Sequence, residues 1–235
     1  KKIIYKVEKH LIRKYENFVV NNFPKVVLVS KEDADFLNCG SAKPVSLCVH
    51  TNGVDMFPIS ATYDPDKICF IGNMRTLQNQ DAALFFAKEV FPLIKNKIPN
   101  AKFYIVGAQP SKDIIDLGRD CNDIIVTGFV DDLYAYVKNS CVAVAPVRIA
   151  AGIQNKVLVA MAMGIPVVLS ELISKAIPEL INMKNCYVCN KADDIANACI
   201  SLMKDGVARE KISKNGYKVV EEHYSWKEKL DGYIK

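Results

Sequence analysis

The chain has no long hydrophobic run. Its most apolar stretch, from Val157 to Leu169, is interrupted by Gly164 and Pro166, whereas a membrane-spanning helix needs about 20 predominantly apolar residues. The lysine-rich N-terminus is not followed by the apolar segment and small-residue cleavage site of a secretory signal. We therefore expect neither a spanning helix nor an export signal in this sequence, and a cytoplasmic location.

Histidine is scarce, and the motifs that usually carry cofactor or catalytic chemistry are missing. The three histidines, His10, His50 and His223, are dispersed along the chain. No His-Glu metal motif, G-x-S-x-G, Walker or G-x-G-x-x-G sequence occurs. These absences remove the sequence basis for a metal site, a serine hydrolase, a P-loop enzyme or a nicotinamide dinucleotide enzyme.

Eight cysteines are present, but they do not form the pattern of a zinc site. Cys69, Cys141 and Cys199 lie in apolar stretches and are expected to be small buried side chains in a reducing compartment. Cys186 and Cys189 form a C-x-x-C, yet a zinc site needs a second pair and a redox motif needs a following helix. A plain β-strand is the favoured interpretation.

The charge pattern does not indicate a nucleic-acid partner. With 31 Lys or Arg against 26 Asp or Glu the net charge is +5, and no basic patch is interleaved with aromatic residues. Residues 1–16 are the most basic segment, with an apolar stripe at helical spacing made of Ile4, Val7, Leu11 and Tyr15. The favoured interpretation is a helix with this stripe on a core, and the alternative is peripheral contact with an anionic membrane surface.

Beyond residue 66 strands alternate with helices. Short apolar strands are expected at 68–71, 103–106, 124–126, 142–145 and 166–169. Helices are expected at 79–95 and 131–138 and in three stretches after residue 192. Two earlier strands, 25–30 and 46–50, precede a linker. This order predicts an α/β fold, a doubly wound parallel sheet, with a small α/β remnant of a second domain.

Sheets of this kind bind ligands beyond the C-terminal ends of their strands. One such loop, residues 145–156, leads into a helix expected to begin near Ile153. Arg148 and the first helical amides would form an anion site, because the helix dipole is positive there. One face of this helix carries Gly152, Asn155, Lys156 and Val159. A pyrophosphate would meet amides, a guanidinium and an ammonium, and the alternative is that both cations only reach solvent.

Two other strand-end loops supply a glycine where a ligand or a tight turn needs room, at Gly72-Asn73 and at Gly107. At residues 152–168 the sequence GIQNKVLVAMAMGIPVV resembles the donor-site signature of GT-B glycosyltransferases, of the kind in retaining family 4. Further likeness covers nearly the whole chain, in FIGNM (70–74) with NQDAA (79–83), PNA (99–101), VTGFVD (126–131), YSW (224–226) and NGVD (52–55). The NGVD segment is similar to the hinge motif that joins the two domains of such enzymes.

The resemblance implies a domain organisation. Residues 1–57 would be the C-terminal edge of an acceptor-binding domain plus the hinge. Residues 58–235 would be the nucleotide-sugar-binding, Rossmann-like domain with its closing helices. Because the chain begins with Lys and not Met, we expect most of the first domain to lie outside it and this chain alone to be inactive.

The resemblance also implies a function. Such proteins are hexosyl- or related glycosyltransferases, retaining and metal-independent, active in polysaccharide or glycoconjugate biosynthesis. They transfer a sugar from a UDP- or GDP-linked donor, which is a substrate and not a cofactor, to a glycan or lipid-linked acceptor, in the cytoplasm or peripherally at the inner membrane face. The residues implied to bind the donor are Gly72, Asn73, Gly107, Gly128, Arg148, Gly152, Asn155, Lys156 and Val159. No catalytic residue is nominated, because acceptor-positioning groups belong largely to the missing domain.

The chain also departs from the family pattern. Relatives commonly carry two glutamates at the positions of Ala151 and Val159, and a basic pair at the positions of Asn73 and Gln78. Val159 cannot accept hydrogen bonds from a ribose, which would cost about 1–3 kcal/mol. These losses keep a second hypothesis open, a catalytically silent module that is a partner or regulatory subunit of a glycosylation complex. A nucleotide-sugar epimerase of the same architecture is a third alternative.

Overall fold

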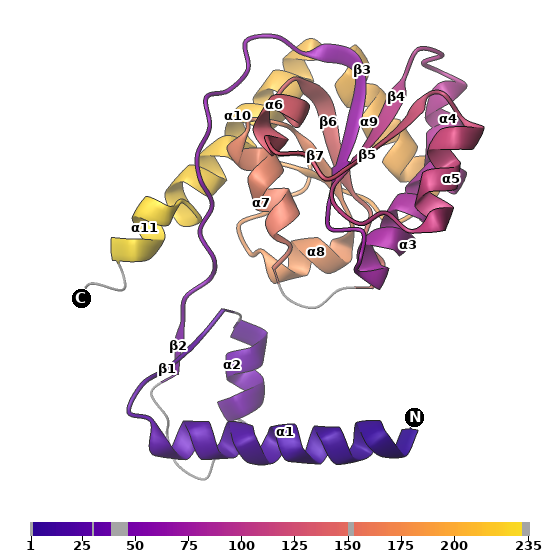
Figure 1. Cartoon of the computed structure of the whole chain (residues 1–235). Helices are drawn as coiled ribbons and strands as arrows, with labels where there is room; N and C mark the ends of the chain where they lie inside the picture. Colours follow the sequence, from indigo (N-terminus) through magenta and orange to yellow (C-terminus); the bar gives the residue numbers. More distant parts are fainter. Residues whose placement is uncertain (1, 30, 39–46, 150–152, 232–235) are drawn as a thin grey trace. The chain divides into compact units, whose positions relative to one another are not determined.

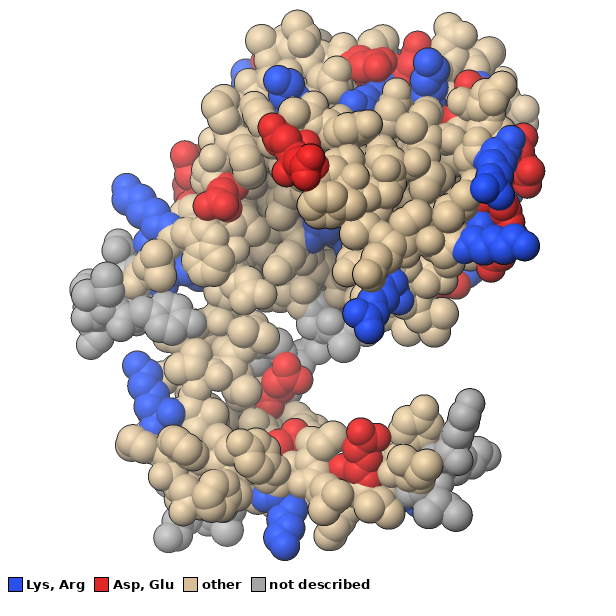
Figure 2. Space-filling view, viewed as in Figure 1, with Lys and Arg blue, Asp and Glu red and all other residues tan. Residues whose placement is uncertain are grey.

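The structure is a computed structural model that describes residues 2–29, 31–38, 47–149 and 153–231 (Figure 1). Contacts within the chain divide it into two compact units, Lys1–Asn52 and Gly53–Lys235. Each unit has its own strands and helices. On the face of the second unit drawn in Figure 2, basic and acidic side chains are interspersed. The division of function between residues 1–57 and 58–235 stays a prediction.

The first unit is a small α/β layer. Helix α1 (Lys2–Asn22) is followed by strand β1 (Val26–Leu28), helix α2 (Lys31–Asn38) and strand β2 (Leu47–Val49). The strands pair in parallel, with Val26 beside Leu47 and Leu28 beside Val49. The two strands predicted near these positions are confirmed, whereas α2 has no counterpart among the expected elements.

The apolar stripe of α1 faces solvent. Exposed fractions of 66%, 55%, 59% and 68% are found for Ile4, Val7, Leu11 and Tyr15. The helix contacts its unit through other side chains, since Val20 is buried and the Arg13 guanidinium lies 4.3 Å from the centre of the Phe36 ring. The expectation that the stripe packs on a core is therefore wrong for the described residues. None of the described helices is long and apolar enough to cross a bilayer.

A six-stranded parallel sheet forms the centre of the second unit. In chain order its strands are β3 (Asp64–Ile71), β4 (Lys102–Val106), β5 (Ile124–Gly128), β6 (Ser140–Ala145), β7 (Val167–Leu169) and β8 (Tyr187–Val188). Their order across the sheet is β5-β4-β3-β6-β7-β8, and every neighbouring pair is parallel. The doubly wound parallel sheet predicted from the sequence is confirmed.

Helices connect the strands and cover both faces of the sheet (Figure 1). They are α3 (Leu77–Phe85), the π-helix η1 (Phe86–Val90), α4 (Phe91–Lys95), α5 (Lys112–Asp120), α6 (Leu133–Val137), α7 (Asn155–Ala162), α8 (Glu171–Ala176), α9 (Ala192–Lys204), α10 (Gly206–His223) and α11 (Trp226–Asp231). The chain steps from β3 to β5 in one direction and from β6 to β8 in the other. Right-handed crossovers then place the connecting helices of the two halves on opposite faces.

Two helices near the site differ in detail from the prediction. The helix expected at 79–95 runs from Leu77 to Lys95 with a π turn in its middle. Its Phe86 and Phe91 rings lie 4.5 and 5.9 Å from the Phe103 ring of β4, which ties this helical segment to the sheet. Helix α7 begins at Asn155 with Gln154 at its N-cap, later than the expected start near Ile153.

The C-x-x-C segment is a strand, as predicted. Strand β8 lies between Cys186 and Cys189, and both thiols are free. Burial raises the pKa of Cys186 to about 12, so this thiol is a poor nucleophile and metal ligand at neutral pH. Among the described residues no group of three or more His, Cys, Asp or Glu side chains could hold a metal ion.

Gly107 occupies a backbone conformation and a space that only glycine fits. Its φ is +148°, and a Cβ there would lie 1.8 Å from the carbonyl oxygen of Gly72. We expect Gly107→Ala to lower the free energy of unfolding by roughly 3 kcal/mol, because the ends of β3 and β4 would have to separate. Urea denaturation followed by circular dichroism measures this loss.

Gly128 provides the matched control. Its φ is also positive, +68°, but a Cβ there would meet nothing within 4 Å. Gly128→Ala should therefore cost only the strain of a left-handed residue, about 1–2 kcal/mol. Equal losses at the two positions would show that the contact with Gly72 is not what demands glycine at Gly107.

Candidate functional site

The candidate site lies at the C-terminal edge of the sheet, where β3 and β6 are neighbours. The chain leaves these two strands in opposite directions, which opens a crevice between their loops. Gly72 and Asn73 follow β3, and Arg148 follows β6. The fold thus brings predicted site residues from distant parts of the sequence to one edge.

Three of the predicted glycines keep neighbouring loops close together. The Gly72 N–H donates to the carbonyl oxygen of Val106 at 3.0 Å, and the Gly107 N–H donates to the carbonyl oxygen of Gly128 at 3.2 Å. A side chain on Gly72 would also crowd Asn79, whose Nδ2 would lie 2.8 Å from the added Cβ. The ends of β3, β4 and β5 therefore form a closely packed backbone surface beside the crevice.

Lys156 of α7 contacts helix α3 and strand β3. Its ammonium donates to the side-chain oxygen of Asn79 and lies 5.2 Å from the centre of the Phe70 ring. Asn79 is held in turn, because its Nδ2 donates to the carbonyl oxygen of Asn73 at 2.8 Å. No ion pair between described residues involves Lys156.

Burial makes the charged form of the Lys156 ammonium less stable than it is in water. It lowers the pKa of Lys156 from 10.5 to about 8, because an ammonium removed from water is destabilised when its protein partners are neutral. The Asn79 amide and the Phe70 ring compensate this loss only in part. An anion bound beside Lys156 would restore the charged form, so the arrangement favours an anionic ligand.

Arg148, the second predicted cation, already has a partner. Its Nε and Nη2 donate to the two carboxylate oxygens of Asp81 at 3.0 and 2.6 Å, and its guanidinium lies 4.5 Å from the centre of the Phe85 ring. Asp81 and Phe85 share one face of α3, because residues four positions apart lie one above the other on a helix. Both side chains therefore contact the guanidinium from the same face of the helix. The hydrogen bond to Asp81 raises the pKa of Arg148.

The two cations meet α3 on different sides. Asn79 contacts Lys156 and Asp81 contacts Arg148, and residues two positions apart on an α-helix are separated by about 200° around its axis. Lys156 is thus linked to Asn73 through hydrogen bonds of Asn79. Arg148 instead contacts Asp81 and Phe85. That both cations bind one diphosphate stays a prediction.

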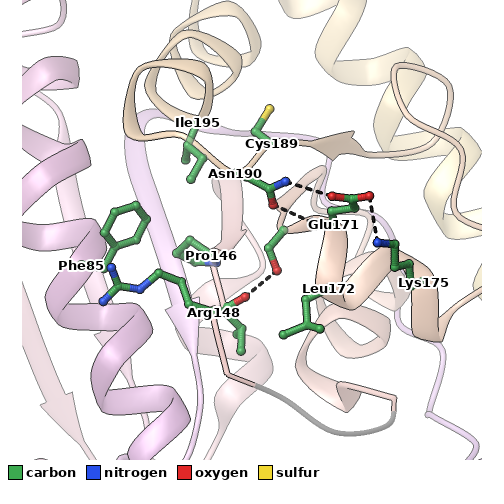
Figure 3. A pocket seen from close by; sticks show the side chains of 11 residues that line it. Phe85, Pro146, Arg148, Glu171, Leu172, Lys175, Cys189, Asn190 and Ile195 are labelled. Atoms are coloured by element: carbon green, nitrogen blue, oxygen red, sulfur yellow. Dashed lines mark hydrogen bonds and ion pairs between the residues drawn. The ribbon is translucent and has the colours of Figure 1, made fainter.

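A pocket of about 340 Å³ lies beside Arg148. Figure 3 shows Arg148 near Phe85 on one side of this pocket and Glu171, Lys175 and Asn190 on the other. The Glu171 carboxylate accepts from Lys175 at 3.0 Å and from Asn190 at 3.2 Å. The three polar side chains on this side of the pocket are therefore hydrogen-bonded to one another.

The remaining predicted residues are on or near α7. Asn155 is its exposed first residue, and Val159, one turn further on, is partly buried against the core. Its isopropyl group offers no hydrogen bond to a ribose. Gly152 lies outside the described residues. The donor-binding role of each predicted residue stays a prediction.

Asn79, Asp81 and Phe85 belong to this site although the sequence analysis assigns them no role. A partial signal exists, because the first turns of α3 are rich in polar residues, and Asn79, which is buried, needs a hydrogen-bond partner. Those partners lie 77 and 67 positions away along the chain. No local pattern could have identified them.

A family model described as glycosyl transferases group 1 matches residues 65–205, more than half of the chain. The chain belongs to this glycosyltransferase family. Its parallel sheet is the Rossmann-like fold of GT-B glycosyltransferases, as the sequence resemblance predicts. No curated protein matches the sequence.

Solved structures of low sequence identity share this fold. A variant of S. aureus TarM in complex with UDP and other ligands has a TM-score of 0.78 and 18% identity, covering 97% of this chain and 46% of TarM. Anabaena HepE in complex with UDP has a TM-score of 0.73 and 14% identity, over 93% and 64% of the two chains. Sucrose-phosphate synthase from Thermosynechococcus elongatus has a TM-score of 0.73 and 18% identity, over 94% and 60%. The glycosyltransferase chain described here therefore spans less than two thirds of each of these proteins.

The lowered pKa of Lys156 predicts a specific pH dependence of stability. The side chain titrates near 10.5 when unfolded and near 8 when folded, so between these values the unfolded state binds more protons and stability rises with pH. Below pH 8 both states are charged and the cost of the buried charge is present in full. We expect the free energy of unfolding of the wild type, relative to Lys156→Met, to rise by up to about 2–3 kcal/mol between pH 8 and 10.5.

Urea denaturation of both proteins across this pH range measures the difference. Taking the difference removes the contributions of groups that titrate alike in both proteins. A difference that stays constant from pH 8 to 10.5 would mean that Lys156 is not buried as described.

Proposed function

We propose that this chain is the nucleotide-sugar-binding half of a glycosyltransferase that transfers a sugar from a UDP- or GDP-linked donor to a glycan or lipid-linked acceptor. One observation carries the proposal. The Lys156 ammonium is partly buried at the β3–β6 crevice, where it donates to Asn79 of α3, and it has no ion-pair partner among the described residues. Such a position suits the phosphates of a nucleotide.

In this proposal the leaving diphosphate is stabilised by the protein. Negative charge develops on it as the bond to the sugar breaks, and Lys156 would offset that charge together with the first amides of α7. We propose that these groups take the place of a divalent metal and that the sugar is transferred with retention of configuration. The nucleotide-sugar is then a substrate, and no cofactor is required.

Ligands bound to structural neighbours support the nucleotide part of the proposal. Anabaena HepE has been solved with UDP and with UDP-glucose. The pneumococcal O-GlcNAc transferase GtfA, with a TM-score of 0.72 and 16% identity, has been solved with UDP and GlcNAc. Those ligands belong to those proteins, and they favour a uridine nucleotide as the first candidate for this chain.

The acceptor side is proposed from the first unit. We propose that residues 1–57 are the edge of an acceptor-binding domain whose remainder supplies the acceptor and catalytic groups, so that this chain alone does not transfer sugar. The solvent-exposed apolar stripe of α1 supports this view, as does the 46% coverage of TarM. A cytoplasmic location, with peripheral membrane contact through α1 as the alternative use of its stripe, completes the proposal.

Val159 favours a second candidate function. Without a carboxylate at this position a nucleotide ribose would lose hydrogen bonds, as expected of a catalytically silent module that acts as a partner or regulatory subunit. One structural neighbour was solved as the GtfA/B complex, which makes an assembly worth testing for this chain. Sugar transfer or donor hydrolysis by the full-length protein would exclude this candidate.

Calorimetric titration with UDP, GDP and ADP tests the proposed function. We expect one of these nucleotides to bind, and Lys156→Met to weaken binding by at least about tenfold, because a charge-assisted contact is worth about 1.5–3 kcal/mol. Lys218→Met is the control, since Lys218 pairs with Glu222 on α10 and should not affect binding. If none of the nucleotides binds at millimolar concentration, the proposal is refuted.

Val159→Glu tests the position of the nucleotide ribose. A carboxylate on this face of α7 would accept hydrogen bonds from the ribose hydroxyls, so we expect nucleotide affinity to increase by about tenfold. Val159→Leu, which adds volume without a hydrogen-bond acceptor, should not increase it. Unchanged affinity in the Glu variant would mean that Val159 does not face the ribose.

A further inference from the structure

The Arg148–Asp81 pair has the features of an exchangeable contact. The bidentate geometry is good, with distances of 3.0 and 2.6 Å. Yet the side chains are 48% and 25% exposed, and ion pairs in contact with water are weak because solvent screens them. The pair therefore fixes the position of the Arg148 guanidinium through a contact that is weak enough to be exchanged.

Arg148 is held on a different side of α3 from the contact between Lys156 and Asn79. Asp81 and Phe85 draw the guanidinium to one side of α3, whereas Lys156 contacts Asn79 on another side. The Glu89 carboxylate also raises the pKa of Arg148, but it contributes less than Asp81 does. Glu171 faces the same pocket but is engaged with Lys175 and Asn190. Asp81 is thus the described carboxylate that determines where the Arg148 guanidinium lies.

We propose that Asp81 competes with the phosphates of the ligand for Arg148, so that Asp81 is a positioning residue that limits diphosphate affinity. In the ligand-free protein Asp81 and Phe85 hold the guanidinium. When a diphosphate binds beside Lys156, Arg148 exchanges one bidentate acceptor for another, a carboxylate for a phosphate. The inference rests on the proposed function, because it assumes that the ligand carries a diphosphate.

The exchange is possible because its two states are close in free energy. Arg148 forms two parallel N–H···O contacts with a carboxylate and can form the same number with a phosphate. Leaving Asp81 sacrifices the contact with the Phe85 ring, whereas joining the ligand adds a second cation to the phosphates. Removing the carboxylate while keeping its shape should therefore shift the balance toward the ligand.

Asp81→Asn provides the test, with Glu171→Gln as the matched control. Each variant removes one negative charge: Asp81 contacts Arg148 directly, whereas Glu171 lines the pocket beside Arg148 and pairs with Lys175 and Asn190. Only Asp81→Asn therefore loosens Arg148. Calorimetry with UDP should show an affinity about three- to fivefold higher for Asp81→Asn and unchanged for Glu171→Gln. Lower or unchanged affinity for Asp81→Asn would overturn the proposal.

A double-mutant cycle separates competition from simple charge repulsion. If Asp81 acts through Arg148, the gain from Asp81→Asn should disappear in an Arg148→Gln background. An equal gain in both backgrounds would mean that Asp81 only repels the phosphates, and the proposal would be wrong. Circular dichroism of each variant establishes that the fold is retained.

Two further measurements keep the inference distinguishable from the proposed function. The Nε–H resonance of Arg148, assigned by its loss in Arg148→Lys, should change in ligand-free Asp81→Asn and not in Glu171→Gln. Inorganic pyrophosphate is titrated alongside UDP, because it carries the phosphates without the nucleoside. Binding of pyrophosphate with the same response to Asp81→Asn, but no binding of any nucleotide, would keep the competition and refute the nucleotide function. Binding of neither probe would refute both.

Discussion

The parallel pairing of β3 with β6 is the contact on which the candidate site depends. These strands are neighbours in the sheet although β4 and β5 lie between them in sequence. Because the chain turns away from them in opposite directions, their C-terminal loops separate and leave a crevice. Gly72, Asn73 and Arg148 owe their common location to this pairing, and α3 and α7 start beside it for the same reason.

Helix α3 contacts both cations of the crevice through side chains of different charge. Its neutral amide Asn79 contacts the partly buried Lys156, and its carboxylate Asp81 contacts the half-exposed Arg148. Burial lowers the pKa of the lysine, and its neutral Asn79 partner supplies no opposite charge to offset this, whereas the hydrogen bond to Asp81 raises the pKa of the arginine. Helix α3 therefore leaves Lys156 without an ion-pair partner among the described residues and pairs Arg148 with a carboxylate. This difference is the basis of the proposed competition between Asp81 and the phosphates.

Much of the second unit could be predicted from local pattern. The buried strands of the parallel sheet are short runs of branched apolar residues, such as Val142–Ala145, and they require no knowledge of distant contacts to be recognised. Helices α2, α5 and α8 are not among the elements that the sequence predicts, because short helices with mixed faces have a weak periodic signal. The stripe of α1 was recognised as a helix face, but periodicity shows only that a face is apolar and not what covers it.

The sequence by itself determined the alternation of strands and helices, the family, and the residue types at the strand ends, because these depend on neighbours a few positions apart. Only the tertiary structure decided which side chains meet. Lys156 contacts Asn79, 77 positions away in the sequence. Arg148 contacts Asp81, 67 positions away, and not an open anion site. Such pairings follow from the order of strands in the sheet and from the rotation of α3 about its axis, and neither quantity is encoded in any single segment of the chain.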